Sequence, residues 1–245
     1  MKTISLSFFA CAAFLLSACV GININSNPRD NSDLVMETRP LNSSFSAVSA
    51  NNGFNVYMVH GPMERVEVQA EAKVLPYIET SVRNGTLSLI VNGHISSNKP
   101  INIYVTYMNL HSISASTHSK IEINSPLKNN TTTIDSNTGA TIDILQIDSD
   151  VIYARCNSQL RIAGQAGLIN VTASGGTIDA QNLVVQQVDA ELKNRSKLAI
   201  HVQRMINAYV SKNSRLDFTG NPRQVNIERE GDGVRGDQQG GGGVR

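Results

Sequence analysis

The sequence predicts an all-β protein whose main part is a parallel β-helix-like solenoid of about 18–21 residues per coil, preceded by short N-terminal strands. Near-copies of one bend and strand, such as "TGATIDI", "SGGTIDA" and "KNSRLDF", recur through the second half of the chain. Small or turn-forming residues precede each copy, and short alternating runs fill the first half. The chain has no Trp and only 6 Phe, so small and β-branched residues must build its core, which favours strands.

Residues 1–18 have the pattern of a signal peptide, in which Lys2 supplies the positive start and Ile4 to Leu16 the apolar run. This run is too short to span a membrane. It ends in "LSAC", which resembles the lipobox of bacterial lipoproteins, where the cysteine is acylated and becomes the new N-terminus. The resemblance implies that Cys19 is the lipidated residue, and ordinary secretory cleavage is the alternative.

The residue after the lipobox cysteine bears on the membrane that a lipoprotein reaches. In lipoproteins of this kind an acidic residue there commonly marks retention in the inner membrane. Here Val20 follows Cys19, so the resemblance implies an outer-membrane lipoprotein of the bacterial cell envelope, facing either the periplasm or the cell surface. Acyl chains, with palmitate among them, would anchor it essentially permanently.

The next two segments are predicted from turn and strand patterns. Residues 19–43 are expected to hold the lipidated cysteine and a flexible tether, because Asn, Ser, Asp and Pro occur there without a sustained period. Residues 44–109 contain short alternating strands, two of them bounded by the turn signals Asn52-Gly53 and Asn84-Gly85. The segment "KVLPYIETSV" allows one helical turn.

The β-helical repeats are expected over residues 110–229. Each copy has a central apolar residue, and the six are Ile121, Ile142, Leu160, Ile178, Leu198 and Leu216. Alternation turns these residues inward and their neighbours outward. One repeat cannot bury its apolar face alone, whereas coils stacked about 4.8 Å apart form a continuous apolar ladder.

A bend precedes each strand of the repeat. Three positions before the central residue, four of the six copies have Gly or Asn, the residues that adopt positive φ at least cost. His118 and Arg195 occupy this position in the other two copies, so looser corners are expected there.

The segments "SFSAVSANNGFNVYMVHG" and "VRNGTLSLIV", together with "TGATIDI" and "SGGTIDA", resemble the bacterial head GIN domain, a putative autotransporter adhesin head domain. The similarity covers about residues 44–234. The motifs are structural, so the resemblance implies the fold and a Gram-negative envelope context without assigning an activity.

Residues 230–245 are rich in Gly and are expected to be a disordered tail. They include Arg235-Gly236-Asp237, which resembles an integrin-binding tripeptide. Gly-rich composition alone accounts for this match, so no function is assigned to it.

One outward column next to the central residues carries charge, and it is the candidate surface ladder: Glu122, Asp143, Arg161, Asp179 and Asp217. Stacked carboxylates repel unless something compensates them. Glu122 and Asp143 could form a glycosidase-like pair, since retaining enzymes use carboxyl groups about 5 Å apart. A solvated face is the preferred interpretation, because Arg161 interrupts the ladder and Lys120 neighbours it, so no catalytic residue is assigned.

The sequence gives little support for a metal site, a cofactor-binding motif or nucleic-acid binding. Only His111 and His118 among the five histidines lie near each other, so no metal site is predicted. No Walker loop, G-x-S-x-G elbow or dinucleotide fingerprint occurs, and no cofactor is expected. A net charge of +1 gives no footprint for nucleic acid. Cys156 is expected to be a half-exposed filler at a corner.

These observations predict a lipid-anchored, non-catalytic cell-envelope protein that presents a β-helical surface for binding or adhesion. Its partners would be the membrane, through the anchor, and an unknown envelope protein or glycan. The alternatives are a polysaccharide-binding or polysaccharide-cleaving β-helix and an envelope assembly factor that engages another protein through one end of the solenoid. Few aromatic residues, Tyr153, Tyr209 and Phe218, lie in the coils to stack on sugars.

Overall fold

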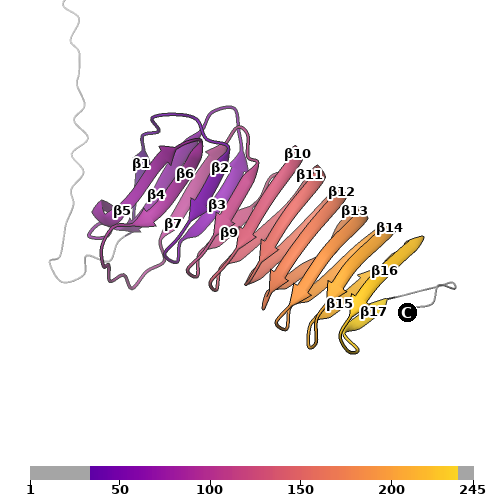
Figure 1. Ribbon diagram of the computed structural model, residues 1–245. Helices are drawn as coiled ribbons and strands as arrows, with labels where there is room; N and C mark the ends of the chain where they lie inside the picture. Colours follow the sequence, from indigo (N-terminus) through magenta and orange to yellow (C-terminus); the bar gives the residue numbers. More distant parts are fainter. Residues whose placement is uncertain (1–33, 237–245) are drawn as a thin grey trace, which may run out of the picture. The chain divides into compact units, whose positions relative to one another are not determined.

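Residues 34–236 are described by the computed structural model, and their strands stack side by side along one axis (Figure 1). The first strands are β1 (Leu34–Arg39), β2 (Ala47–Ala50), β3 (Asn55–His60), β4 (Arg65–Glu71), β5 (Ile78–Arg83), β6 (Thr86–Val91) and β7 (Asn102–Tyr107). The later strands are β8 (Ser112–Ala115), β9 (Lys120–Ile123), β10 (Leu127–Ser136), β11 (Thr141–Cys156), β12 (Gln159–Ser174), β13 (Thr177–Lys193), β14 (Lys197–Val210), β15 (Arg215–Thr219), β16 (Gln224–Arg229) and β17 (Val234–Gly236). The predicted solenoid of stacked parallel strands is confirmed.

Each coil has two faces that enclose the core. Face A consists of β3, β9, the first parts of β11 to β14, β15 and β17. Face B consists of β2, β8, the last parts of β10 to β14, and β16. A long strand such as β11 runs along face A with residues 141–144 and then passes a register shift. It pairs again over residues 147–149, in a short ladder between the faces, and continues along face B with residues 151–156.

The predicted apolar ladder is confirmed on face A. Ile142 pairs in register with Ile121 on one side and with Leu160 on the other. The same stacking continues through Ile178, Leu198 and Leu216. All six side chains are buried, so the sequence correctly separates inward from outward positions.

Tight bends carry the chain from face B of one coil to face A of the next. Five of the six predicted bend residues have positive φ, namely His118, Gly139, Gly175, Arg195 and Asn213. The corners at His118 and Arg195 are closed by backbone hydrogen bonds of 3.1 Å, against 3.0 Å at the Gly139 corner. These two corners are therefore not looser than the others, contrary to expectation.

In two copies the small residue after the bend is a serine that bonds to the neighbouring coil. Ser119 accepts hydrogen bonds on its Oγ from the backbone N–H groups of Gly53 and Phe54, at 3.1 and 3.3 Å. Ser196 Oγ accepts in the same way from Gly175 N at 2.9 Å. A hydroxyl at this position thus ties the bend to the neighbouring coil.

The repeats begin before residue 110, which corrects the predicted boundary. β2 and β3 already form a coil, since β2 pairs in parallel with β8 and β3 with β9. Val56 occupies the ladder position next to Ile121, and Asn52 and Gly53 form the bend with positive φ. Phe54 stands where later copies have a small residue, which hides this coil from a comparison of the repeats.

The N-terminal end is covered by antiparallel strands. β4 pairs with β7, and β1 pairs with the other edge of β4. β5 and β6 form a hairpin, preceded by the predicted helical turn, the 3-10 helix η1 (Leu75–Tyr77). The prediction of a flexible tether is wrong for residues 34–39, because β1 satisfies the backbone groups of the β4 edge.

The C-terminal end is formed by β16 and β17. β17 lies within the segment predicted to be disordered, and that prediction is wrong for Val234–Gly236. The chain fits closely here, because a Cβ atom on Gly236 would lie 2.1 Å from Cζ of Phe218. The signal peptide, Cys19, Asp237 and the rest of the tail lie outside the described residues.

The register predicts a large loss of stability for one substitution and a small loss for a substitution at the adjacent residue. Leu160→Asp should lower the free energy of unfolding by at least about 3 kcal/mol, because it leaves an unpaired charge in the apolar ladder. Gln159→Asp is the matched control, and its exposed position should limit the change to about 0.5 kcal/mol. Urea unfolding of both variants measures the difference. Equal losses would contradict the register.

Candidate functional site

The structure brings the predicted surface ladder together on face A as an ion-pair network. Glu122 and Asp143 lie in register on β9 and β11. Lys120 Nζ binds the Glu122 carboxylate and lies 4.0 Å from Asp143, and Arg161 approaches Asp143 to 3.1 Å. The hydrogen bond to Glu122 raises the pKa of Lys120.

The network continues along the column. Arg161 lies 3.9 Å from Asp179, where the network ends at Ala199, and Asp217 forms a separate pair with Arg215 at 2.5 Å. Asp143 is only 8% exposed, so the interpretation as a solvated face is wrong for this residue. Cations contact both Glu122 and Asp143, and neither carboxyl has the apolar surroundings that keep a catalytic acid protonated.

Two further sequence expectations concern single side chains. Cys156 is fully buried, not half exposed, because its column on β11 faces the core, and this burial raises the pKa of its thiol. Within residues 34–236, no group of three or more His, Cys, Asp and Glu side chains could hold a metal ion. His111 and His118 form no such group.

A groove of about 1000 Å³ crosses the outer surface of face B over β12, β13, β14 and β16. Two outward rows form its walls. The amide wall is Asn170, Asp189, Asn207 and Asn226, and the tyrosine wall is Thr172, Glu191, Tyr209 and Glu228. The residues between them, Val171, Ala190, Ala208 and Ile227, form the floor.

The dimensions of this groove follow from strand geometry. On each strand the two walls are two residues apart, which is about 6.6 Å. Four neighbouring strands give the groove a length of roughly 14 Å along the solenoid axis. The side chains of Val171, Ala190 and Ala208 are buried and face the core, so the floor between the walls is strand backbone that no side chain covers.

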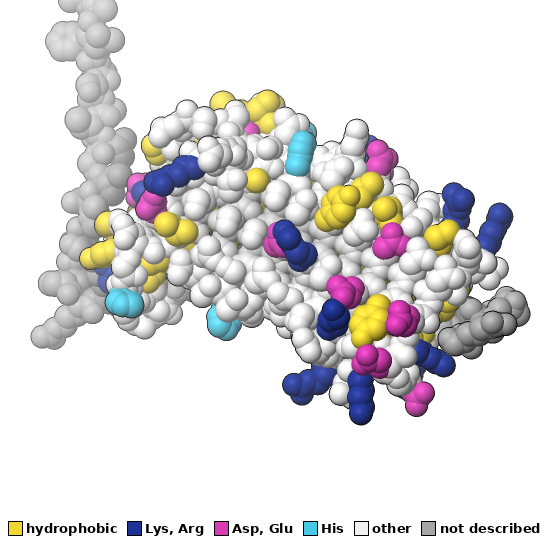
Figure 2. Space-filling view, in the orientation of Figure 1, with side chains coloured by type: hydrophobic (Ala, Val, Ile, Leu, Met, Phe, Trp, Pro, Cys, Tyr) yellow, Lys and Arg dark blue, Asp and Glu magenta, His cyan; other side chains and the backbone are white. Residues whose placement is uncertain are grey.

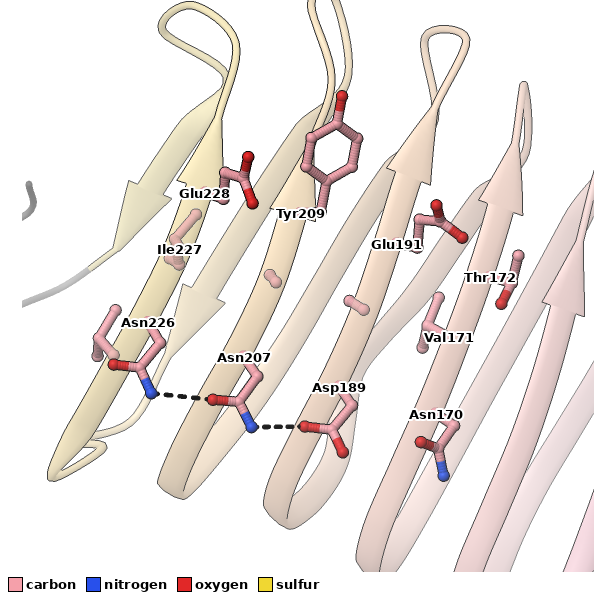
Figure 3. A pocket seen from close by; sticks show the side chains of 13 residues that line it. Asn170, Val171, Thr172, Asp189, Glu191, Asn207, Tyr209, Asn226, Ile227 and Glu228 are labelled. Atoms are coloured by element: carbon pink, nitrogen blue, oxygen red, sulfur yellow. Dashed lines mark hydrogen bonds between the residues drawn. The ribbon is translucent and has the colours of Figure 1, made fainter.

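The amide wall is joined internally by hydrogen bonds (Figure 3). Asn226 Nδ2 donates to Asn207 Oδ1 at 3.0 Å, and Asn207 Nδ2 donates to Asp189 Oδ1 at 2.7 Å. Gln187 Nε2 donates to both carboxylate oxygens of Asp189 at 3.1 Å. These bonds fix the wall before any ligand arrives.

The tyrosine wall is held by interactions with charged side chains. Tyr209 lies between Glu191 and Glu228 in Figure 3, and its hydroxyl donates to Glu230 Oε1 at 2.8 Å. This bond lowers the pKa of Glu230 and raises that of Tyr209. Lys193 Nζ lies 5.8 Å from the centre of the Tyr209 ring and pairs with Glu191.

Larger side chains end the groove toward the N-terminus. On β11 the two wall positions are taken by Tyr153, which pairs with Asn170, and by Arg155, which pairs with Thr172. Arg155 donates from Nε and Nη2 to the two carboxylate oxygens of Asp135, at 2.7 and 3.2 Å. The groove therefore spans the C-terminal coils.

Reasoning from the sequence did not find this groove. Its signal was present, since Asp189, Asn207 and Asn226 recur with the coil period. The predicted columns cover the strand after each bend, whereas these residues lie on the second strand of each coil. Tyr209 belongs to an outward row there, which its scarcity as an aromatic residue does not reveal.

Comparison with known proteins identifies a family and several solved structures that are similar to this chain. The family model described as "Putative auto-transporter adhesin, head GIN domain" matches residues 44–222. No curated protein matches the chain. Among residues 34–236, no helix has the length and apolar character to cross a membrane.

Several solved structures share the fold. A putative adhesin from Bacteroides fragilis has a TM-score of 0.76 and 18% identity, over 83% of this chain and 96% of that one. A putative adhesin from Parabacteroides distasonis has a TM-score of 0.66 and 16% identity, over 84% and 97%. A putative lipid binding protein from the same organism has a TM-score of 0.67 and 14% identity, over 85% and 98%.

The ion-pair network predicts a measurable coupling. Lys120→Met should lower the free energy of unfolding by about 1 kcal/mol, because Glu122 and Asp143 then repel each other. Adding Glu122→Gln should restore most of the loss. Lys197→Met is the control, because Lys197 occupies the same outward column and faces Arg215, so its loss should be neutral or stabilising. Urea unfolding tests this, and equal losses at 120 and 197 would exclude the network.

Proposed function

The chain belongs to the head GIN domain family of putative auto-transporter adhesins, and from this premise we propose that it is a non-catalytic envelope protein that binds an extended glycan in the face-B groove. The observation that carries the proposal is the pair of polar walls on either side of a narrow floor. A groove one chain wide suits a linear polymer better than a globular partner.

The chemistry of the walls favours a glycan. Sugar hydroxyls both donate and accept hydrogen bonds, and the walls supply amides that do both and carboxylates that accept. Tyr209 adds an aromatic side chain. A peptide strand is a weaker candidate, because the backbone groups of β12 to β14 already pair with neighbouring strands and offer it no edge.

Preorganisation supports the same proposal. Ordering interfacial side chains costs binding free energy. Asn207 and Asp189 are already joined by a hydrogen bond, and Tyr209 is held by Glu230. The groove can thus bind without first immobilising these side chains.

The proposal assigns no catalytic role to the two places where carboxylates gather. On face A, Lys120 and Arg161 bind Glu122 and Asp143. In the groove, Gln187 and Asn207 donate to Asp189, and Lys193 pairs with Glu191. In both places the carboxylate oxygens are thus bound by donors of the protein itself, which does not favour their use on a glycosidic bond.

We further propose that Cys19 carries a lipid anchor and that the protein is an outer-membrane lipoprotein. Support comes from the "LSAC" sequence at the end of the apolar run and from Val20 after it. The anchor would keep the solenoid at the cell envelope, where a glycan-binding groove can contribute to adhesion.

The groove hypothesis is tested by two variants and a matched control. Asn207→Ala and Tyr209→Ala should each lower affinity for a bound glycan about five- to tenfold. Asn102→Ala is the control, because Asn102 sits in a similar ladder on face A between Asn55 and Gln69. A glycan array identifies a glycan that the wild-type protein binds, and calorimetry then measures the affinity of each variant for that glycan.

Two results would contradict this hypothesis. One is equal loss of affinity in the Asn102 variant, and the other is the absence of any glycan binding by the wild-type protein. Chromatography of the glycan after incubation should show an uncleaved polymer. Cleavage that Glu122→Gln abolishes would overturn the non-catalytic assignment.

The anchor predicts a separate outcome. Cys19→Ser should abolish acylation and move the protein from the membrane fraction to the soluble fraction, because the variant lacks the thiol that is acylated. Metabolic labelling with a fatty-acid probe measures this, with Cys156→Ser as the control. Unchanged labelling of the Cys19 variant would refute lipidation at this residue.

A further inference from the structure

Two arginines lie side by side at the bend between the faces of the C-terminal coils. Arg204 and Arg223 occupy neighbouring coils, and Arg223 N donates to Arg204 O at 2.9 Å. Both are exposed. They line a pocket of about 440 Å³ together with Gly167, Gln186, Gln187, Met205 and Gln224.

This pair carries an uncompensated charge. Like charges at facing positions of neighbouring strands destabilise a sheet. On face A such a cost is compensated where Lys120 lies between Glu122 and Asp143. Within residues 34–236 neither Arg204 nor Arg223 forms an ion pair.

The surroundings of the pocket are consistent with an anion as the missing partner. Figure 2 shows Lys and Arg side chains interspersed with Asp and Glu over the C-terminal coils. The side-chain amide of Gln224 adds hydrogen-bond donors to the pocket, whereas those of Gln186 and Gln187 donate to Gln203 and Asp189. A guanidinium presents a planar fork that matches carboxylate or sulfate oxygens in a bidentate arrangement.

The pocket adjoins the groove across the amide wall. Met205 and Gln224 each precede a wall residue, Asn207 or Asn226, by two positions on the same strand. Gln187 lines the pocket and also donates to Asp189 of the wall. The long, exposed arginine side chains therefore start about three residues, or roughly 10 Å along the strand, from the groove wall.

We infer that Arg204 and Arg223 bind acidic substituents of the glycan that occupies the groove, which makes the preferred ligand an anionic polysaccharide carrying carboxylate or sulfate groups. This inference rests on the proposed function and adds a charge requirement to it. Carboxylates of the groove walls do not prevent such binding, because Asp189 is hydrogen-bonded to Gln187 and Asn207 and Glu191 is paired with Lys193.

The experiment compares charged polymers with neutral forms of the same backbone. Polygalacturonate and its methyl ester test carboxylates, and chondroitin sulfate and its desulfated form test sulfates. Affinities for the full chain are measured by calorimetry at low and at high salt. Exposed charges are screened by salt, so the preference for charged polymers should shrink at high salt.

The variant is Arg204→Gln/Arg223→Gln, and its matched control is Arg65→Gln/Arg83→Gln, which removes the same charge from exposed positions near the N-terminal end. The pocket variant should lose at least about tenfold in affinity for the charged polymer, because charge-assisted hydrogen bonds are lost. Its affinity for the neutral form should stay within about twofold of wild type. The control should bind both forms as wild type does.

The outcomes separate this inference from the function on which it rests. A preference for one charged polymer that the pocket variant abolishes supports the inference, and the preferred polymer identifies the acidic group. Equal binding of charged and neutral polymers overturns it, as does an equal loss in the control. Binding of the charged polymer that depends on Asn207 but not on the arginines overturns the inference and leaves the groove hypothesis intact. Absence of binding to every polymer and to the glycan array overturns both.

Discussion

The stacking of apolar side chains in exact register on face A is the constraint on which the rest of the molecule depends. Ile142 lies between Ile121 and Leu160, and each is buried by its neighbours. Because strand side chains alternate, this inward stack determines every outward position. A slip of one residue in β13 would turn Asp189 and Glu191 into the core and remove part of both groove walls.

Stacking identical positions also brings like groups together, and the protein compensates for this in different ways. Amides join into ladders, as in Asn226, Asn207 and Asp189. Charges alternate or share a counter-ion, and aromatic rings stack, as Tyr57 and Tyr104 do with centroids 5.4 Å apart. The two arginines at the bend lack such compensation, as Lys197 does where it faces Arg215.

The sequence predicted the coil period, the ladder and the bends because these depend on local patterns that repeat. It did not predict the first coil, where Phe54 replaces a small residue, or β1, whose order comes from pairing with the distant strand β4. Asp143 was placed correctly in the outward column, but its burial depends on Lys120 and Arg161 from other coils. The groove lies on the second strand of each coil, where "HSISA", "LINVT" and "INAYV" share little beyond alternation.

The groove is assembled from one pair of wall residues per coil, and this has an evolutionary consequence. Duplication of a coil would add one more pair of wall residues and lengthen the site by about 4.8 Å, without disturbing the pairs already present. Substitution of a single wall residue would alter the contact with one unit of the polymer alone. Ligand length and ligand composition can therefore diverge independently among descendants of this chain, the first by gain or loss of whole coils and the second by point mutation.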